Sequence, residues 1–221
     1  MTDVRGTVEI AVEERVLDIN DAVAAEVRVA LGLRDILAVD LIGAPGSGKT
    51  ALLEATLREL RGRRRPGVLV GDLTTRRDGD RLARWCDQVV QISTGQGCHL
   101  EAHQVRDALG QIDLDSIDLL FIENVGNLIC PVGFDLGQAA TVGLFSLTEG
   151  DDKAAKHPYL VETADVLLLN KIDLAPYLTF DRAGFDADVR LLNPNVPVLG
   201  VSATTGEGLD AWLDWLDAAR T

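Results

Sequence analysis

The sequence predicts an α/β fold in which a mostly parallel, seven-stranded sheet carries helices on both of its faces. The first observation is that short apolar runs alternate with amphipathic stretches along the 221 residues, which is typical of parallel strands joined by crossover helices. The second is that no repeat, low-complexity tract or linker divides the sequence, so we expect a single domain over residues 1–221. The third is a glycine-rich loop directly after the first predicted strand.

The predicted strands are short apolar runs, and the first of them is expected to be buried on both faces. The strands are expected over residues 36–42, 67–71, 88–92, 118–123, 142–147, 165–169 and 196–201. An amphipathic helix over about residues 8–31 precedes them, because apolar residues recur there every three or four positions. Further helices are expected after the glycine-rich loop, over residues 81–86, up to about residue 109, and near the C-terminus.

The composition argues against several classes of function. A net charge of −14 and an isoelectric point near 4.5 argue against nucleic acid as a partner, because a phosphate backbone requires a basic surface. There is no run of roughly 18 apolar residues and no signal-peptide core at the N-terminus, so we expect a cytoplasmic protein without a membrane span. The 3 cysteines are too few for a disulfide framework, which favours free thiols or metal ligands.

The glycine-rich loop fits the phosphate-binding pattern G-x-x-x-x-G-K-S/T and stands between a predicted strand and a predicted helix, as that pattern requires. The glycines allow consecutive backbone N–H groups to point at phosphate oxygens, next to the positive end of the helix dipole. Lys49 is expected to reach the β- and γ-phosphates, and the Thr50 hydroxyl to bind Mg²⁺. The residues of this candidate site are Gly43, Ala44, Pro45, Gly46, Ser47, Gly48, Lys49 and Thr50.

Three acidic residues lie after predicted strands, at the edge where ligands bind in parallel sheets. Asp72 directly follows the second strand and Asp78 lies in a polar loop over residues 74–80; either could approach Mg²⁺ or could instead cap a helix. Glu123 ends the fourth strand, where phosphate-loop proteins place a carboxylate near Mg²⁺. Gly126 could donate its N–H to the γ-phosphate, and no glutamine stands beside it to orient water, so we expect slow turnover. The expected catalytic residues are Lys49, Thr50, Asp72, Asp78 and Glu123.

A candidate base pocket follows the N-K-x-D pattern and the Ser-Ala pair after the last strand. Its residues are Asn170, Lys171, Asp173, Ser202 and Ala203. The Asp173 carboxylate can accept hydrogen bonds from N1–H and the N2 amino group of guanine, whereas adenine lacks that pair of donors and would leave the carboxylate unpaired. Asn170 is expected to join neighbouring loops, the stem of Lys171 to cover one face of the base, and the Ala203 N–H to donate to guanine O6. Together with the phosphate loop, this pattern favours GTP over ATP.

A candidate transition-metal site combines Cys98 and His99 with Cys130, which follows the fourth strand. Two thiolates and an imidazole suit a soft ion. His99 and His103 are expected on the helix that follows. Adjacent side chains of a regular helix diverge by about 100°, so Cys98 and His99 could bind one ion together only at a helix N-terminus. Alternatively, two subunits could share the ions. At such an N-terminus the pKa of the Cys98 thiol should be lowered. The alternative is that Cys130 is a small core residue and Cys98 an incidental cap.

Four segments carry a resemblance to a known family: Gly-Cys-His-Leu-Glu-Ala-His (97–103), Phe-Ile-Glu-Asn-Val-Gly-Asn-Leu-Ile-Cys-Pro (121–131), Thr-Glu-Gly-Asp-Asp (148–152) and the N-K-I-D element. Through them the sequence is similar to the HypB family, the nickel-insertion GTPases of nickel–iron hydrogenase maturation. The likeness extends from the phosphate loop to the C-terminus. The resemblance implies a GTP-dependent homodimer, a hydrogenase maturation partner protein and the hydrogenase large subunit as partners. It implies Cys98, His99 and Cys130 as ligands of nickel or zinc, and Asp72, Asp78 and Glu123 as the acids around Mg²⁺.

We therefore expect a metallochaperone GTPase that couples GTP binding and hydrolysis to dimerisation and nickel delivery. One alternative is a phosphate-loop kinase of a small molecule, which the N-K-x-D element opposes. Another is a regulatory GTPase without a metal role, such as one related to the urease-accessory GTPases, which carry a Cys-Pro-His element where this sequence has separate Cys-His and Cys-Pro elements. The sequence contains neither a cysteine-rich nickel motif at its N-terminus nor a histidine-rich tract, so the resemblance does not imply high-affinity nickel binding at the N-terminus or nickel storage.

Overall fold

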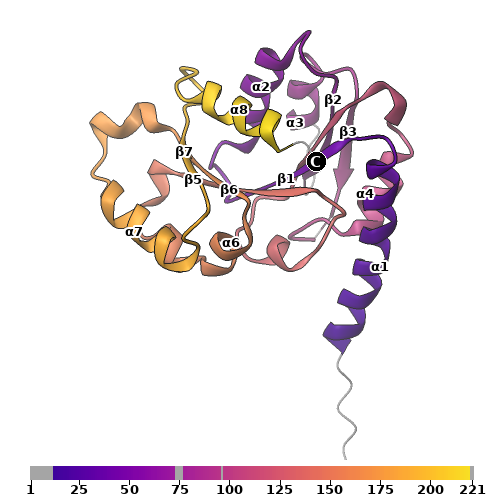
Figure 1. Cartoon of the computed structure of the whole chain (residues 1–221), viewed down its shortest axis with the longest axis horizontal. Helices are drawn as coiled ribbons and strands as arrows, with labels where there is room; N and C mark the ends of the chain where they lie inside the picture. The colour runs from indigo at the N-terminus through magenta and orange to yellow at the C-terminus, as the bar shows by residue number, and fades with distance from the viewer. Residues whose placement is uncertain (1–11, 73–76, 96, 220–221) are drawn as a thin grey trace, which may run out of the picture.

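Parallel strands form one sheet at the centre of the molecule (Figure 1). The computed structural model describes residues 12–72, 77–95 and 97–219, and within them 7 strands follow the order β3-β2-β4-β1-β5-β6-β7. The strands are β1 (Leu37–Gly43), β2 (Pro66–Asp72), β3 (Val89–Ser93), β4 (Leu119–Glu123), β5 (Ala140–Ser146), β6 (Val166–Asn170) and β7 (Val198–Gly200). All of the pairings between them are parallel. The predicted fold class is confirmed, and the sheet is wholly rather than mostly parallel.

Helices cover both faces of the sheet (Figure 1). The α-helices are α1 (Val12–Gly32), α2 (Lys49–Leu60), α3 (Arg77–Leu82), α4 (Ala102–Leu109), α5 (Lys153–Lys156), α6 (Pro158–Thr163), α7 (Arg182–Leu192) and α8 (Leu209–Ala218). Short 3-10 helices are η1 (Leu114–Ser116), η2 (Cys130–Gly133), η3 (Leu147–Glu149) and η4 (Ile172–Tyr177). On one face α2 and α8 pack with α3, and on the other α1 lies beside α4, with α6 and α7 next to them along the sheet.

The core is divided by the sheet because successive side chains of a strand point to opposite faces. In β1, Leu37, Val39 and Leu41 pack with α2 and α8, whereas Ala38 packs with α1 and α4. All seven residues of β1 are buried, as expected of a strand covered on both faces. The fully buried Trp212 of α8 also donates from Nε1 to Thr56 Oγ1 of α2 at 3.0 Å, so its one polar atom is satisfied.

Three predicted elements differ from those of the structure. The prediction of a polar loop over residues 74–80 is wrong from residue 77 on, because α3 begins at Arg77. The helix predicted over residues 81–86 is also placed too late in the sequence, since α3 ends at Leu82. Asp78 and Asp80 in its first turn and Arg81 in its last turn complement the helix dipole. The last strand is shorter than the predicted range 196–201, and Pro197 before it has no N–H to donate. Residues 8–11 of the predicted first helix lie outside the described residues.

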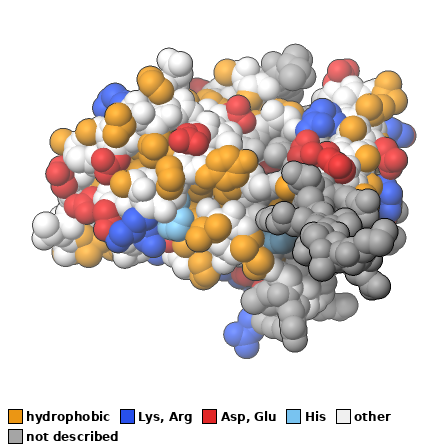
Figure 2. All heavy atoms as spheres, turned by 90° about the horizontal axis from the view of Figure 1, so that it is seen from below, with side chains coloured by type: hydrophobic (Ala, Val, Ile, Leu, Met, Phe, Trp, Pro, Cys, Tyr) orange, Lys and Arg blue, Asp and Glu red, His pale blue; other side chains and the backbone are white. Residues whose placement is uncertain are grey.

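The face of the molecule drawn in Figure 2 carries charges of both signs. Figure 2 shows a face on which hydrophobic side chains gather between acidic and basic ones, with basic side chains interspersed rather than collected in one broad patch. Among the described helices, none combines the length and apolar character that crossing a bilayer requires.

Candidate nucleotide and metal site

The glycine-rich loop connects β1 to α2 at the edge of the sheet where the parallel strands end. Gly46 and Gly48 have φ angles of 79° and 99°, in the region that residues with a side chain rarely adopt. A Cβ on Gly48 would lie 2.5 Å from Asn170 Nδ2. Glycine is therefore required at both positions for backbone conformation, and at Gly48 also to let Asn170 approach the loop.

Lys49 is the first residue of α2 and is only 8% exposed. Its Nζ donates to the carbonyl oxygens of Gly43 at 2.9 Å and Ala44 at 3.3 Å. Burial lowers the pKa of Lys49, and the negative charges of Glu123, Glu149 and Asp78 oppose that effect. The ammonium group lines the cavity described below, where phosphate oxygens would be far stronger partners than two neutral carbonyls.

Thr50 and Glu123 meet across the end of the sheet, where the Thr50 hydroxyl donates to Glu123 Oε1 at 2.7 Å. Burial raises the pKa of Glu123 to about 7, although the Thr50 hydrogen bond and Lys49 lower it. Its second oxygen, Oε2, is buried and has no hydrogen-bond partner among the described residues. A buried carboxylate oxygen without a partner, beside a hydroxyl group, fits a hard cation such as Mg²⁺.

Most of the predicted phosphate and magnesium residues line a single cavity of about 380 Å³, whereas Gly43, Ala44 and Ser47 of the loop do not. Asp72 and Asp78 lie on it together with Glu123 and Gly126. Asp78 also accepts a hydrogen bond at 3.4 Å from Arg81, which the sequence did not point to and which pairs with Glu54 of α2 as well. The cavity thus has basic groups from α2 and α3 and acidic groups from β2, α3 and β4, a combination that suits a magnesium-bound polyphosphate.

The candidate base-pocket residues are joined to one another and to the phosphate loop. Asn170 Nδ2 donates to Ser47 O at 2.9 Å, and Asn170 Oδ1 accepts from the N–H of Lys171 at 2.8 Å and of Ala203 at 3.2 Å. The Ser202 hydroxyl donates to Asp173 Oδ1 at 2.6 Å. The Ala203 N–H, expected to face guanine O6, is engaged by Asn170 in this structure. One amide side chain therefore ties the two loops of the pocket to the phosphate loop.

Lys171 has a left-handed backbone, with a φ angle of 63°. Its Nζ donates to Gly46 O at 2.6 Å and to Thr148 Oγ1 at 3.2 Å. The lysine stem therefore spans from the base pocket to the phosphate loop. Thr148 belongs to the 148–152 segment, so that segment also lies at this site, although no predicted role was attached to it.

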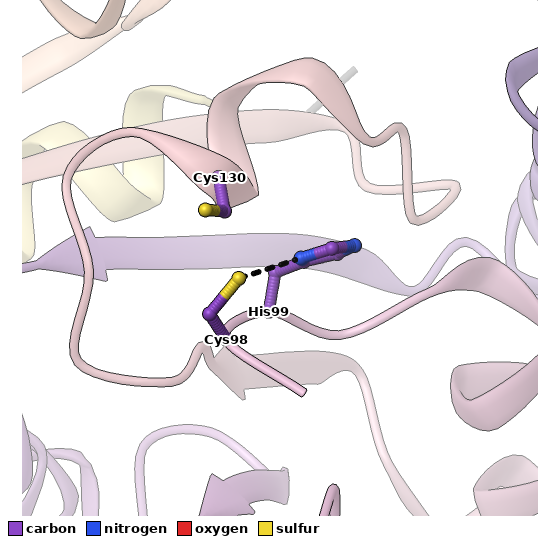
Figure 3. A group of neighbouring side chains, drawn as sticks. All are labelled: Cys98, His99 and Cys130. Carbon is purple, nitrogen blue, oxygen red and sulfur yellow. Dashed lines mark hydrogen bonds between the residues drawn. The ribbon is translucent and has the colours of Figure 1, made fainter. Parts of the chain in front are cut away.

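Cys98 and His99 lie on the loop before α4 and Cys130 begins η2; the three come together (Figure 3), and their ligand atoms all lie within 4.8 Å of one another. Cys98 Sγ lies 3.5 Å from His99 Nδ1. The imidazole packs on Phe134 with ring centroids 3.9 Å apart, and its buried Nε2 has no hydrogen-bond partner among the described residues. Burial lowers the pKa of His99, which favours the neutral ring that metals bind. Two thiols and one imidazole at this spacing fit a soft divalent ion.

Two expectations about this cluster are wrong. His99 does not lie on a helix with His103, because α4 begins at Ala102 with Glu101 as its capping residue; His103 instead pairs with Glu101 through Nδ1 at 3.2 Å. The pKa of the Cys98 thiol is raised rather than lowered, since a hydrogen bond with the Cys130 thiol favours the protonated form. Cys98 lies too far before α4 to gain from its dipole, which acts over about one turn.

Asn124 and Asp40 are buried polar residues that the sequence analysis did not single out. Asn124 Nδ2 donates to Asp40 Oδ1 at 3.2 Å, and Asn124 Oδ1 accepts from the N–H of Leu100 at 3.1 Å and of Val125 at 3.0 Å. Asp40 is 0% exposed, and burial raises its pKa to about 7 although the Asn124 bond lowers it. The signal that could have revealed the pair was a single acid inside the apolar run of the first strand.

Asp40→Asn should change the pH dependence of stability. Because the folded-state pKa of Asp40 lies near 7 and its ordinary value is 3.8, the folded protein retains a proton that the unfolded chain has released. Stability from this group is full below about pH 4 and is lost as the pH rises toward and through 7. We expect the loss between pH 5 and pH 8 to be about 2 kcal/mol smaller in Asp40→Asn. Urea unfolding in the presence of a chelator measures it, and equal losses in both proteins would contradict the assignment.

The loop geometry, the buried lysine and the acidic residues around the cavity are those of a phosphate-loop nucleotide-binding domain. Residues 37–200 match the family described as CobW/HypB/UreG, nucleotide-binding domain. The chain belongs to this family.

Similar proteins agree with this assignment over nearly the whole chain. A hydrogenase maturation factor HypB from Azotobacter vinelandii is 47% identical over 212 residues, which cover 96% of this chain and 70% of the relative. The crystal structure of a hydrogenase maturation factor HypB from Archaeoglobus fulgidus has a TM-score of 0.86 and 39% identity, covering 93% of this chain and all of that one. The crystal structure of HypB from Helicobacter pylori in complex with nickel has a TM-score of 0.87 and 34% identity, covering 91% of this chain and 95% of that one.

Proposed function

We propose that this chain is a GTPase that delivers nickel during the maturation of nickel–iron hydrogenase, with GTP binding and hydrolysis coupled to dimerisation. The observation that carries the proposal is that one short segment serves both sites. Glu123 at its start lines the phosphate cavity, and Cys130 at its end lies with Cys98 and His99. The names of the relatives support the pathway, and the nickel complex of the Helicobacter pylori protein supports the metal.

In the proposed reaction, water attacks the γ-phosphorus of GTP, the bond from that phosphorus to the β,γ-bridging oxygen breaks, and GDP and inorganic phosphate leave. The loop N–H groups and Lys49 Nζ hold the phosphate oxygens as negative charge moves onto GDP. Mg²⁺ would be held by Thr50, Asp72, Asp78 and Glu123, and supplies positive charge to the phosphates. The neighbours of Gly126 are Val125 and Asn127 rather than glutamine, so we infer that unaided turnover is slow.

Nickel is the proposed cargo of the cluster formed by Cys98, His99 and Cys130, and zinc suits the same donors. Three ligands occupy only three of the four positions around a tetrahedral ion, so water or a residue of a second subunit supplies the fourth ligand. We propose a GTP-dependent homodimer in the cytoplasm, in which each chain is a single domain over residues 1–221. A maturation partner protein and the hydrogenase large subunit are its proposed partners.

The alternative functions have less support. A regulatory GTPase without a metal role would give no reason for two thiols and an imidazole from separate segments of the chain to converge. A small-molecule kinase would have no need of an Asp173 carboxylate held in place by Ser202, beside the phosphate loop.

Metal and nucleotide are expected to strengthen the same dimer. In the wild type, a GTP analogue with Mg²⁺ should promote dimerisation, and nickel or zinc should tighten that dimer by at least about 10-fold, or about 1.4 kcal/mol. Cys98→Ala should lose the metal effect and keep GTP hydrolysis, because Cys98 lies outside the phosphate cavity. Sedimentation with GDP or a GTP analogue, with and without metal, measures both effects.

The matched control for this experiment is Cys86→Ser. Cys86 is also a free cysteine, but it is buried away from the cluster, with Sγ 3.1 Å from Pro66 O and 3.4 Å from Gln88 O. It should respond to metal like the wild type. If metal leaves association unchanged in the wild type, or if Cys98→Ala responds to it normally, the proposed coupling is wrong.

A further inference from the structure

The side chain of Asn124 joins three segments of the chain at the point where β4 ends. It is 1% exposed. Its Oδ1 accepts from the N–H of Leu100, the residue after His99, and from the N–H of Val125, the residue before Gly126. Its Nδ2 donates to Asp40 in β1, which leads into the phosphate loop. A single amide group therefore contacts the metal-ligand loop, the segment after Glu123 and the strand that carries the phosphate loop.

The residues just after Asn124 contact the phosphate loop on one side and the metal-ligand loop on the other. A Cβ on Gly126 would lie 3.1 Å from Pro45 Cα, so its backbone is packed closely against the phosphate loop. Asn127 forms an isolated antiparallel bridge with Gly43, while its Nδ2 donates to Cys98 O at 3.4 Å. A shift of this segment toward a bound γ-phosphate would thus pull on the backbone at both Cys98 and Leu100.

Asp40 fixes which way the Asn124 amide faces. Two backbone N–H donors on one side require the amide oxygen there, and the Asp40 carboxyl on the other side requires the amino group. Turning the amide over would set donor against donor at Leu100 and Val125. Because buried donors and acceptors without partners are costly, the arrangement has one stable orientation, and a displacement of any one segment is passed to the others through it.

We propose that Asn124, oriented by Asp40, is the positioning residue that couples the nucleotide state to the geometry of the metal ligands. This inference rests on the proposed function, in which GTP and metal binding are coupled. Asn124 does not ligate the metal ion; it holds the backbone next to His99 in a position that depends on the segment after Glu123. The bond to Leu100 carries most of the effect, and the contact from Asn127 to Cys98 supplements it.

The test compares metal affinity in two nucleotide states. Nickel or zinc affinity is measured by competition with a chromophoric chelator, in protein saturated with GDP and in protein saturated with a non-hydrolysable GTP analogue. The readout is the ratio of the two affinities, which for ordinary allosteric coupling is about 5- to 150-fold. In Asn124→Ala we expect this ratio to fall below about 2, because Leu100 and Val125 lose their common acceptor. Nucleotide affinity is measured in parallel, so that saturation is assured in each variant.

Two isosteric variants keep the test decisive if alanine at position 124 unfolds the protein. N124D keeps an acceptor for Leu100 but replaces the amino group that donates to Asp40 with a second buried carboxyl. The two carboxyls either repel or share a proton, so the side chain is no longer held in one orientation, and the ratio should also fall. The double variant D40N/N124D exchanges the partners and restores one donor facing one acceptor, and it should recover the ratio to within about threefold of the wild type. The matched control is Asn193→Ala, which removes an amide that donates to Val161 O at 3.1 Å, distant from both sites. It should leave the ratio unchanged.

The outcomes separate this inference from the proposed function. A wild type with equal metal affinity in both nucleotide states overturns both, because there is no coupling to transmit. A coupled wild type with an equally coupled Asn124→Ala or N124D overturns the role of Asn124 alone. A double variant that stays as uncoupled as N124D overturns the orienting role of Asp40. The inference is supported if the ratio of metal affinities falls in Asn124→Ala and in N124D, recovers in D40N/N124D, and is unchanged in Asn193→Ala.

Discussion

Asp173→Asn is expected to weaken GTP binding by roughly 100-fold or more and to make xanthosine triphosphate the preferred nucleotide. The Ser202 hydroxyl donates to Asp173 Oδ1 at 2.6 Å. In the variant, the oxygen of the new amide can keep that bond, which directs its amino group toward the base. The amide oxygen can still accept from the N1–H that guanine and xanthine share, whereas the amino group meets the N2 donor of guanine unfavourably and can donate to the O2 carbonyl of xanthine. Competition between labelled GTP and xanthosine triphosphate measures the switch.

The matched control for the base pocket is Asp186→Asn. Asp186 pairs with Arg182 on the surface of α7, with Oδ1 2.8 Å from Nε. The Asp186→Asn variant should bind GTP with an affinity within about twofold of the wild type, because surface ion pairs contribute little to stability. If Asp173→Asn binds GTP as tightly as this control does, the base pocket is assigned to the wrong residues.

Lys49→Ala is expected to lower GTP turnover by roughly 100- to 1,000-fold, since it removes the one buried ammonium group that can stabilise charge on the β- and γ-phosphates. The fold should persist. The substitution removes a desolvated cation from the wall of the cavity, and the groups that lose a hydrogen-bond donor are two neutral carbonyls, those of Gly43 and Ala44. Phosphate release and thermal unfolding measured on the same preparation separate loss of chemistry from loss of structure.

The control for Lys49→Ala is Lys156→Ala. Lys156 is one of the few other lysines of the chain and pairs with Asp152 one turn earlier on α5, where its side chain is exposed. Its loss should change turnover by less than about twofold. Normal turnover by Lys49→Ala, with an unchanged unfolding curve, would mean that the phosphate site has been assigned to the wrong loop.

The fold could be predicted because its signals are local. Each strand of the sheet is a short apolar run, and the glycine-rich loop marks the first strand–helix junction without ambiguity. The errors fall where tertiary contacts decide. α3 begins at Arg77 although its sequence is polar throughout its first turn, and it is held there by the ion pair from Arg81 to Glu54 of α2 and by the Gly79 N–H donating to Gln91 at 3.2 Å. None of these partners is adjacent in sequence.

The residue types of the candidate site could be predicted, but not the way in which they are held. Cys98, His99 and Cys130 were identified by their chemistry, whereas the sequence suggested that His99 sits on a helix. The structure ends the loop at Glu101, because that side chain and Gln104 cap each other's backbone N–H groups. Asn124 escaped notice for a related reason: an asparagine after a strand is typical of a turn, and only the packed structure shows that its amide reaches Leu100 and Asp40.

The left-handed backbone at Lys171 bears on how this protein balances durability against activity. Glycine or asparagine would adopt a φ of 63° with less strain, whereas lysine there costs about 1–2 kcal/mol of folding free energy. The chain gives up that stability to keep an ammonium group that bridges the base pocket to Gly46 of the phosphate loop. Selection for stability alone would favour glycine or asparagine here, so we propose that the lysine is retained for nucleotide binding at the expense of thermal resistance.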